Sequence, residues 1–402
     1  YCFLLTLVVQ KSTSMSAFNR RNFLKASGIA VLPAFLPAAA KAAGNTKPYA
    51  EEPIIKFFYD GEDFNPAQYI TELQKINSKE AIKRDFYLQG GAVAAMEKKF
   101  EEITGKEKAI CMPTGTMANQ LAIAVLSGDN TKVFVQDTSH VYRDEADAAQ
   151  SVFQKRLMPL AKGQTYFTAE ELKTAITALK EQEVFASGIG AVSVENPVRR
   201  TDGRMIPIEE IRKISEYCRS NNIPLHMDGA RIFMAAAWSG ISVKEYASYF
   251  DTVYISLYKY LGGANGAVLC GTKTVIDKMP HLVKIHGGTV FSNWFSAAMV
   301  LSRLEGIENR LQESIKQSAA VFSGLNKKPG LKVSALEGGT NIYTLEIDKK
   351  IDGNKMQQQL NKEFNIRILP PGDKSKITLT VNETILYRDA AYIINAFKSC
   401  AG

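Results

Sequence analysis

Apolar and polar residues follow two recurring patterns along most of the chain. Short apolar runs, typical of buried strands, are followed by polar loops and then by segments with helical spacing of apolar residues. Strands are predicted at Lys108–Met112, Lys132–Gln136, Ile189–Val194, Ile223–Met227, Thr252–Leu257 and Ala267–Cys270. Helices are predicted between them at Gly91–Thr104, Thr116–Ser127, Ala169–Gln182, Pro207–Asn221 and Val243–Phe250. This alternation predicts an α/β fold with a mostly parallel sheet covered on both faces.

The pattern changes after the last of these strands. One long helix is predicted over Arg303–Leu325, as a bridge to a smaller C-terminal α+β domain. In that domain the predicted strands are Lys332–Val333, Asn341–Ile347, Ile366–Leu369 and Lys376–Val381, and the predicted helices are Gly353–Phe364 and Leu386–Ser399. We divide the chain into a leader (1–43), an N-terminal segment (44–80), a large domain (81–310) and a small domain (311–402).

The leader has the order of features that marks an export signal. Two arginines, Arg20 and Arg21, precede a weakly apolar run over Ile29–Leu36, and an Ala-rich stretch over Ala38–Ala43 follows. This order predicts a twin-arginine signal and a periplasmic location, or a cytoplasmic one if the leader is not functional. We expect the native chain to start at Met15. Beyond the leader, no run is long and apolar enough to predict a membrane span.

Composition narrows the class of protein further. The chain has 402 residues and a formal net charge of +8, and five of those positive charges lie in residues 1–43, which contain no Asp or Glu. The remaining +3 does not predict a nucleic-acid partner. The five cysteines have neither a disulfide-framework spacing nor a metal-ligand spacing, so buried structural thiols are expected.

Polar residues follow five of the predicted strands, and in parallel sheets ligands bind at that edge. They are Pro113–Asn119, which opens a helix, the segment 137–140 with His140, Glu195-Asn196, Asp228–Arg231, and Lys259. Each has an ordinary structural explanation: a capped turn, a loop histidine, an ion pair, or a lysine that extends to solvent. Their joint occurrence at one edge favours a binding site.

This set of groups suits pyridoxal 5′-phosphate (PLP). A lysine against an apolar wall loses its charge easily and can form a Schiff base. The carboxylate of Asp228 can keep a pyridine nitrogen protonated, and the helix N-terminus at Gly115 and Thr116 can hold a phosphate. The Pro-Thr-Gly-Thr turn lacks a P-loop lysine, no Gly-x-Gly-x-x-Gly follows a strand, and no metal site is predicted.

The same motifs resemble those of the low-specificity L-threonine aldolases, in the aromatic amino-acid β-eliminating lyase family of PLP enzymes of fold type I. The similar stretches are Pro113–Asn119, Glu195-Asn196, Gly203–Pro207 and His226–Phe233. The resemblance implies a Schiff base at Lys259, a ring-stacking His140, Asp228 on the pyridine nitrogen, and Asn196 and Arg231 beside cofactor or substrate. It also implies a homodimer or homotetramer with the active site across the subunit interface.

The departures from the family pattern lie on the substrate side. Pro197-Val198 stands where the family has Thr-His, Tyr258 precedes the lysine where Ser is common, and Tyr59-Asp60 replaces a Ser-Asp pair. Lys376 stands where an arginine is expected to bind a carboxylate. The substrate residues predicted from the resemblance are Tyr59, Tyr87, Arg231, His286 and Lys376.

These features together predict an aldolase that cleaves a β-hydroxy-α-amino acid to glycine and an aldehyde, with Lys259, His140 and Asp228 as catalytic residues. The base is His140 or a water that it holds, and His286 is a second group for the edge of the site. A β-eliminating lyase, a transaminase or a racemase on the same scaffold stays open, as does a non-enzymatic protein with decayed chemistry. The sequence leaves the natural amino acid and its stereochemistry undetermined.

Overall fold

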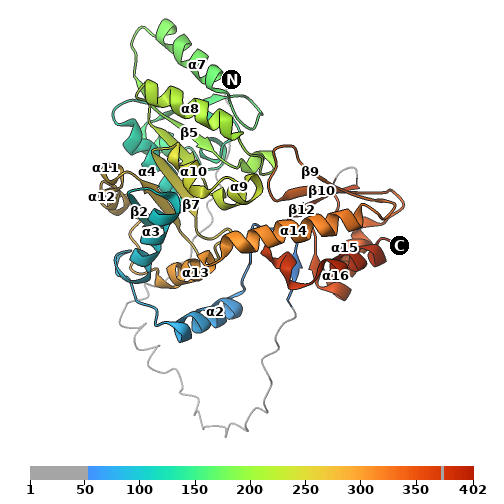
Figure 1. The fold of residues 1–402 in the computed structure, drawn as a ribbon. Coiled ribbons are helices and arrows are strands. Elements are labelled where there is room, and N and C mark those ends of the chain that lie inside the picture. Colours follow the sequence, from blue (N-terminus) through green and yellow to red (C-terminus); the bar gives the residue numbers. More distant parts are fainter. Residues whose placement is uncertain (1–52, 373–374) are drawn as a thin grey trace, which may run out of the picture. The chain divides into compact units, whose positions relative to one another are not determined.

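The computed structural model describes residues 53–372 and 375–402, apart from the side chain of one helical residue (180). The predicted leader therefore lies outside the described residues. Within the described part, residues 53–402 form one compact unit, drawn in Figure 1. The domain boundaries proposed above stay predictions, although the hydrophobic core of this unit does divide into a main part and a C-terminal part.

A seven-stranded sheet forms the centre of the unit. Its strands, in spatial order, are β2 (Lys108–Met112), β8 (Ala267–Gly271), β7 (Thr252–Ser256), β6 (Leu225–Asp228), β5 (Ile189–Glu195), β3 (Lys132–Gln136) and β4 (Arg156–Leu160). Only β8 runs antiparallel to its neighbours. The predicted fold class, a mostly parallel sheet in an α/β architecture, is therefore confirmed. The sequence pattern missed β4, whose Pro159 is tolerated because β4 is an edge strand.

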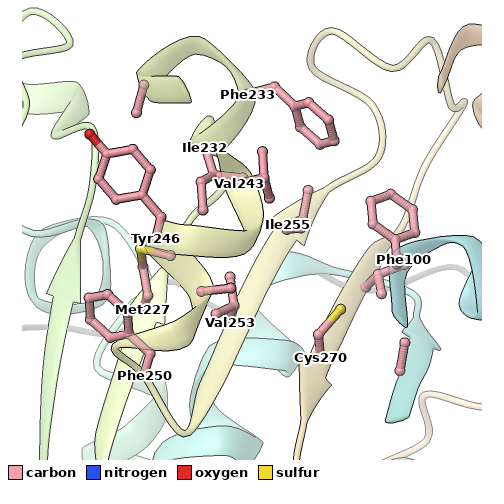
Figure 2. Close-up of a cluster of buried hydrophobic side chains, with 14 of the residues drawn as sticks. Phe100, Met227, Ile232, Phe233, Val243, Tyr246, Phe250, Val253, Ile255 and Cys270 are labelled. Carbon is pink, nitrogen blue, oxygen red and sulfur yellow. The ribbon is translucent and has the colours of Figure 1, made fainter. Parts of the chain in front are cut away.

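Both faces of the sheet are buried, because successive strand residues enter different cores. On β7, Val253 and Ile255 pack on one side with helices α3 (Gly91–Thr104), α9 (Ile232–Ser239) and α10 (Val243–Ser248). Figure 2 shows these side chains around Tyr246 and Phe250. The residue between them, Tyr254, packs on the opposite side against α4 (Gly115–Ser127). Burial of a Phe side chain such as Phe100 stabilises the fold by about 1.5–3 kcal/mol.

The remaining helices of the main part lie between and beside these strands. They are α2 (Pro66–Lys79), α5 (His140–Arg143), α6 (Ala148–Phe153), α7 (Ala169–Gln182), α8 (Ile208–Ser220), α11 (Lys273–Ile276), α12 (Met279–Ile285) and α13 (Trp294–Leu304), with a short 3-10 turn at Arg199–Thr201. Five of the six strands and four of the five helices predicted in this region match their observed bounds within one residue at each end. The exceptions are β6, which begins two residues later than predicted, and α10, which ends two residues earlier. Helix α2 was not predicted.

The long helix predicted over Arg303–Leu325 is present as α14 (Ile307–Leu325), but it begins at Ile307 rather than at Arg303. Helix α13 ends at Leu304 and α14 begins after Gly306, whose backbone φ of 64° is readily adopted only by glycine. The first turns of α14 pack in the main core, through Ile307 and Leu311, and its last turns pack in the C-terminal core. Figure 1 shows α14 extending from beside α13 to the C-terminal part.

The C-terminal part contains a three-stranded antiparallel sheet of β9 (Leu331–Ala335), β10 (Ile342–Ile347) and β12 (Lys376–Thr380). Helices α15 (Gly353–Phe364) and α16 (Ala390–Cys400) and a 3-10 turn (Glu383–Tyr387) accompany it. The N-terminal strand β1 (Ile55–Lys56) pairs with β11 (Ile366–Arg367), so the start of the described chain belongs to this core. None of the helices described is long and apolar enough to cross a membrane.

Candidate active site

The turn between β2 and α4 forms the predicted phosphate cradle. Oγ1 of Thr114 accepts a hydrogen bond from the backbone N–H of Met117 and caps the helix. The first helical residue, Gly115, cannot be replaced without a clash, because a Cβ there would lie 2.1 Å from Oη of Tyr254. The N–H groups of Gly115 and Thr116 precede the first hydrogen bond of the helix, which Ala118 donates to Thr114. Such N–H groups at a helix N-terminus bind anions.

Asp228 ends β6 on the face of the sheet that α4 covers, and it is buried. One carboxylate oxygen accepts from the backbone N–H of Ala230 at 3.1 Å, and the other accepts from Nδ2 of Asn119 on α4 at 2.9 Å. The geometry therefore suits the predicted partner of a protonated ring nitrogen.

His140 begins the short helix α5 after β3, and its ring is partly exposed. Its backbone N–H donates to Oε2 of Glu195 at 2.7 Å, which fixes the start of the helix. Its ring Nδ1 lies 3.0 Å from Oε1 of the buried Glu145. This contact raises the pKa of His140 despite burial, and burial raises the pKa of Glu145. Because Glu145 binds Nδ1, the other ring nitrogen, Nε2, is left to interact with a ligand.

Glu195 and Asn196 follow β5 and are buried. The carboxylate of Glu195 accepts from the backbone N–H groups of His140 and Arg199, while burial, together with the charge of Asp228, raises its pKa to about 7. Oδ1 of Asn196 accepts from the backbone N–H of Ile206 at 2.9 Å. Asn196 thus holds the neighbouring segment, and its predicted role as a cofactor ligand stays a prediction.

Lys259 lies just beyond the end of β7. Burial, together with the positive charge of Arg231, lowers its pKa to about 8. Its Nζ is 5.7 Å from the centre of the Tyr258 ring, and that ring is half exposed. A lysine with a depressed pKa is partly uncharged near neutral pH, and the uncharged amine is the form that attacks a carbonyl carbon.

Arg231 is held by the N-terminal part of the chain. Its Nε donates to Oδ1 of Asp60 at 2.9 Å, and both side chains are largely buried. The chain around Asp60 packs closely on the lysine segment, since a Cβ on Gly61 would lie 2.7 Å from Cα of Tyr260. Residues almost 200 positions apart in the sequence therefore meet beside Lys259.

The other predicted substrate residues lie on exposed surfaces. Tyr59 is 60% exposed and has a positive φ of 65°. Tyr87 contacts the Phe291 ring, and the exposed His286 contacts the Phe153 ring at 5.0 Å. Lys376 lies on β12, where its ammonium is 2.7 Å from Glu346 of the neighbouring strand, and that pair is exposed. The structure brings Asp228, His140 and the α4 N-terminus together. Among the described residues, Lys376 makes no contact with these three. The roles of all four stay predictions.

Several residues of the site were not predicted from the sequence to be functional. Glu145 belongs to no motif, and Asn119 and His226 belong to motifs without an assigned role, yet all three lie in one hydrogen-bonded group with Asp228. Ligand atoms of His140, Glu145 and Asp228 lie within 4.8 Å of one another. The amide group of Asn119 already donates hydrogen bonds to both carboxyl groups. The expectation that the protein binds no metal stays a prediction.

The residues present fit PLP. The site offers a helix N-terminus for a phosphate, a buried carboxyl group for a ring nitrogen, a partly exposed imidazole beside it, and a lysine of lowered pKa. The glycine at position 115 leaves room where any Cβ would meet Tyr254.

Comparison with known proteins agrees with this fit. Residues 79–348 match the model of the beta-eliminating lyase family, and the chain belongs to that family. It is a PLP-dependent lyase with the fold of type I PLP enzymes. The family and fold type predicted from the motifs are thus confirmed.

Three individual proteins of known or assigned activity are similar to this chain. A low-specificity L-threonine aldolase of Candida albicans is 32% identical over 286 residues, which span 70% of this chain and 75% of the relative. An alanine racemase of Cochliobolus carbonum is 31% identical over 293 residues, 71% of this chain and 73% of the relative. The solved structure of Leishmania major threonine aldolase superimposes with a TM-score of 0.65 at 17% identity, covering 87% of this chain and all of that one.

Proposed function

We propose that the protein is a PLP-dependent aldolase that cleaves a threonine-like β-hydroxy-α-amino acid to glycine and an aldehyde. The observation that carries the proposal is the meeting of Asp228, His140 and the α4 N-terminus at one sheet edge, beside a lysine of lowered pKa. Membership of the family and the identity to the Candida albicans enzyme support the choice of reaction.

In this proposal the residues of the chain divide the work. The bound cofactor supplies an electron sink for the pair released when a bond at the substrate's α-carbon breaks. Gly115 and Thr116 would hold its phosphate, Asp228 would hold its ring nitrogen, and Lys259 would supply the amine that binds it covalently. His140 would contact the cofactor, as the family resemblance implies, and its Nε2 would accept the substrate's hydroxyl proton directly or through a water. Glu145 holds Nδ1 of that ring and so directs Nε2 outward.

The substrate carboxylate needs a cation, and Arg231 is a guanidinium whose charge acts on Lys259. Asp60 binds Nε of Arg231, which leaves the terminal N–H groups for a carboxylate. Loss of Asp60 would free the arginine to move, so the pair sets the position of the substrate as well as its charge. Lys376 is the weaker choice, because Glu346 already neutralises it.

A product panel tests the proposed reaction. The protein loaded with PLP is incubated with L-threonine, L-allo-threonine, serine, alanine and tryptophan, and glycine, aldehyde, ammonia, keto acid and the other enantiomer are assayed. We expect glycine and aldehyde in equal amounts from the β-hydroxy amino acids, with none from Lys259→Ala. Lys213→Ala, which changes an exposed lysine on α8, is the matched control and should behave as the unmodified protein.

Two other products would contradict the aldolase reaction. The racemase relative and the Val198 position, where the family pattern has histidine, favour a test for alanine racemisation in the same panel. Formation of the other enantiomer of alanine, without glycine and aldehyde, would identify a racemase, and ammonia with pyruvate would identify a β-eliminating lyase. If no substrate gives any product, the proposed reaction class is wrong.

We also propose that the protein forms a homodimer or homotetramer, as the family resemblance implies. An aromatic cluster supports this: Phe86, Tyr87 and Phe291 are each 54% exposed, with ring centres 5.3–6.0 Å apart. It borders a cavity of about 550 Å³ beside the edge strand β2. Exposed aromatic patches of this kind mark interfaces. Light scattering of Phe291→Glu, with Val184→Glu on a distant exposed loop as control, tests the assignment; an unchanged mass contradicts it.

The leader supports a third proposal, export to the periplasm. Arg20 and Arg21 precede the apolar run and the Ala-rich stretch in the order that twin-arginine signals have. This route carries folded proteins, so PLP can be bound before export. Fractionation of cells that make the chain with Arg20→Lys and Arg21→Lys, against the unmodified chain, tests it. Periplasmic protein that needs both arginines supports the proposal, and retention of both chains in the cytoplasm contradicts it.

A further inference from the structure

Behind Asp228, hydrogen bonds join buried side chains from β7 to α4. Oγ1 of Thr252 lies 2.8 Å from Nδ1 of His226, and Nε2 of His226 lies 3.0 Å from Oδ1 of Asn119. Nδ2 of Asn119 then lies 2.9 Å from Asp228 and 2.8 Å from Oε1 of Glu145. All five side chains are buried. One amide group therefore contacts both carboxylates of the site.

When both carboxyl groups act as acceptors, one arrangement of hydrogens satisfies this chain. The two N–H groups of Asn119 then point at Asp228 and Glu145, and its oxygen points at His226. That oxygen needs a donor, which is the Nε2–H of His226, and Nδ1 then accepts from the hydroxyl of Thr252. Burial lowers the pKa of His226 to about 4, so the ring is neutral, as this arrangement requires. The reversed amide would face its oxygen toward two negative charges.

We propose that Asn119, held in place by His226, is a positioning residue for the cofactor: it fixes the orientation of the Asp228 carboxylate toward the ring nitrogen. This inference rests on the proposed function, because it assigns the partner of Asp228. One amide group donates to both Asp228 and Glu145, so it holds the two carboxyl groups in a fixed relation. His226 acts through Asn119, and Thr252 acts through His226.

The test measures PLP binding rather than turnover. The dissociation constant for PLP is obtained from the visible absorption of the complex, and thermal unfolding of the cofactor-free protein is followed in parallel. Loss of a hydrogen bond to a buried charge corresponds to about a tenfold or larger rise in the dissociation constant. We expect that rise in Asn119→Ala and in His226→Leu, together with a change in the pH dependence of the absorption band.

Conservative variants separate positioning from folding. Gln at position 226 keeps an N–H donor for Asn119, so His226→Gln should stay within about threefold of the unmodified protein. Thr252→Ser keeps the hydroxyl and Thr252→Val removes it at nearly constant volume, so Val should weaken PLP binding and Ser should not. The double variant of Asn119→Ala with His226→Leu should bind PLP no more weakly than Asn119→Ala alone, because the histidine acts through the asparagine.

Two results would overturn the inference. One is normal PLP affinity in Asn119→Ala or His226→Leu while the unmodified protein binds PLP, including the case in which only thermal stability falls. The other is equal loss of affinity in His226→Gln and His226→Leu. If the unmodified protein itself does not bind PLP, the proposed function fails and this inference fails with it, so the two failures are distinguishable.

Discussion

The replacement of Gly115 by alanine is a quantitative test of the packing that surrounds the phosphate cradle. The added Cβ would lie 2.1 Å from Oη and 2.5 Å from Cζ of Tyr254, where ordinary contacts are 3.4–4 Å. Tyr254 is 3% exposed and packs between α4 and the sheet, so its ring has little room to move by the required ångström.

Two effects of Gly115→Ala oppose each other. Alanine favours a helix over glycine by up to about 1 kcal/mol, and less at a first helical position. Overpacking of a tight core costs about 1–3 kcal/mol, sometimes more. Because the clash involves a buried ring, we expect it to win and the free energy of unfolding to fall by about 1–2 kcal/mol. The same displacement should weaken PLP binding, since Gly115 forms the cradle.

Urea unfolding of the cofactor-free protein measures the stability effect. The matched control is Gly372→Ala, where a Cβ would meet nothing closer than 3.5 Å, and its free energy of unfolding should change by less than about 0.5 kcal/mol. Tyr254→Leu removes the ring that the new Cβ would meet. The double variant with Gly115→Ala should therefore be destabilised by at least about 1 kcal/mol less than the sum of the two single variants. A Gly115→Ala protein as stable as the unmodified one would refute this account of the turn.

Three further predictions concern titration and reactivity. The pKa of Lys259 is about 8 when folded and 10.5 when unfolded, so between these values the unfolded chain binds more protons, and the stability of the unmodified protein should rise with pH relative to Lys259→Met; a constant difference contradicts this. Glu145→Gln should lower the pKa of His140, which Asp228 and Glu195 also face, and should move the acid limb of the kcat/KM profile to lower pH. The control, Asp144→Asn, removes a carboxylate paired with Arg200 and should move that limb less. Equal shifts in the two variants would contradict the role of Glu145. Burial raises the pKa of the thiols of Cys111 and Cys270, so they should react with a disulfide reagent only after unfolding, and fast labelling of the folded protein would show that the burial is wrong.

The sequence predicted the sheet well because its strands are short apolar runs with both faces buried. Tyr254 and Ile255 enter opposite cores, yet both are apolar, so the run is continuous and easy to detect. Helix α2 was missed although Asn65 and Gln68 make a capping box, with Pro66 at the first helical position, that the sequence displays. The start of α14 was predicted too early, at Arg303, because the stop at Gly306 was not recognised.

The candidate site was predictable where function requires particular residue types at strand ends. Lys259, Asp228 and His140 belong to that class. Asn119, Glu145 and His226 do not, because their importance comes from contacts between α4, β6 and the chain after α5, which have no signature in sequence spacing. Asp60 illustrates the same limit: its partner Arg231 is 171 positions away.

The most direct test of the whole account is the site of PLP attachment. The protein is loaded with PLP, reduced with borohydride, digested and mapped by mass spectrometry. We predict a single pyridoxyl group on Lys259, at the end of β7, and none in the Lys259→Ala protein. Labelling of another lysine, or no labelling of the loaded protein, would contradict the assignment of Lys259 and the function built on it.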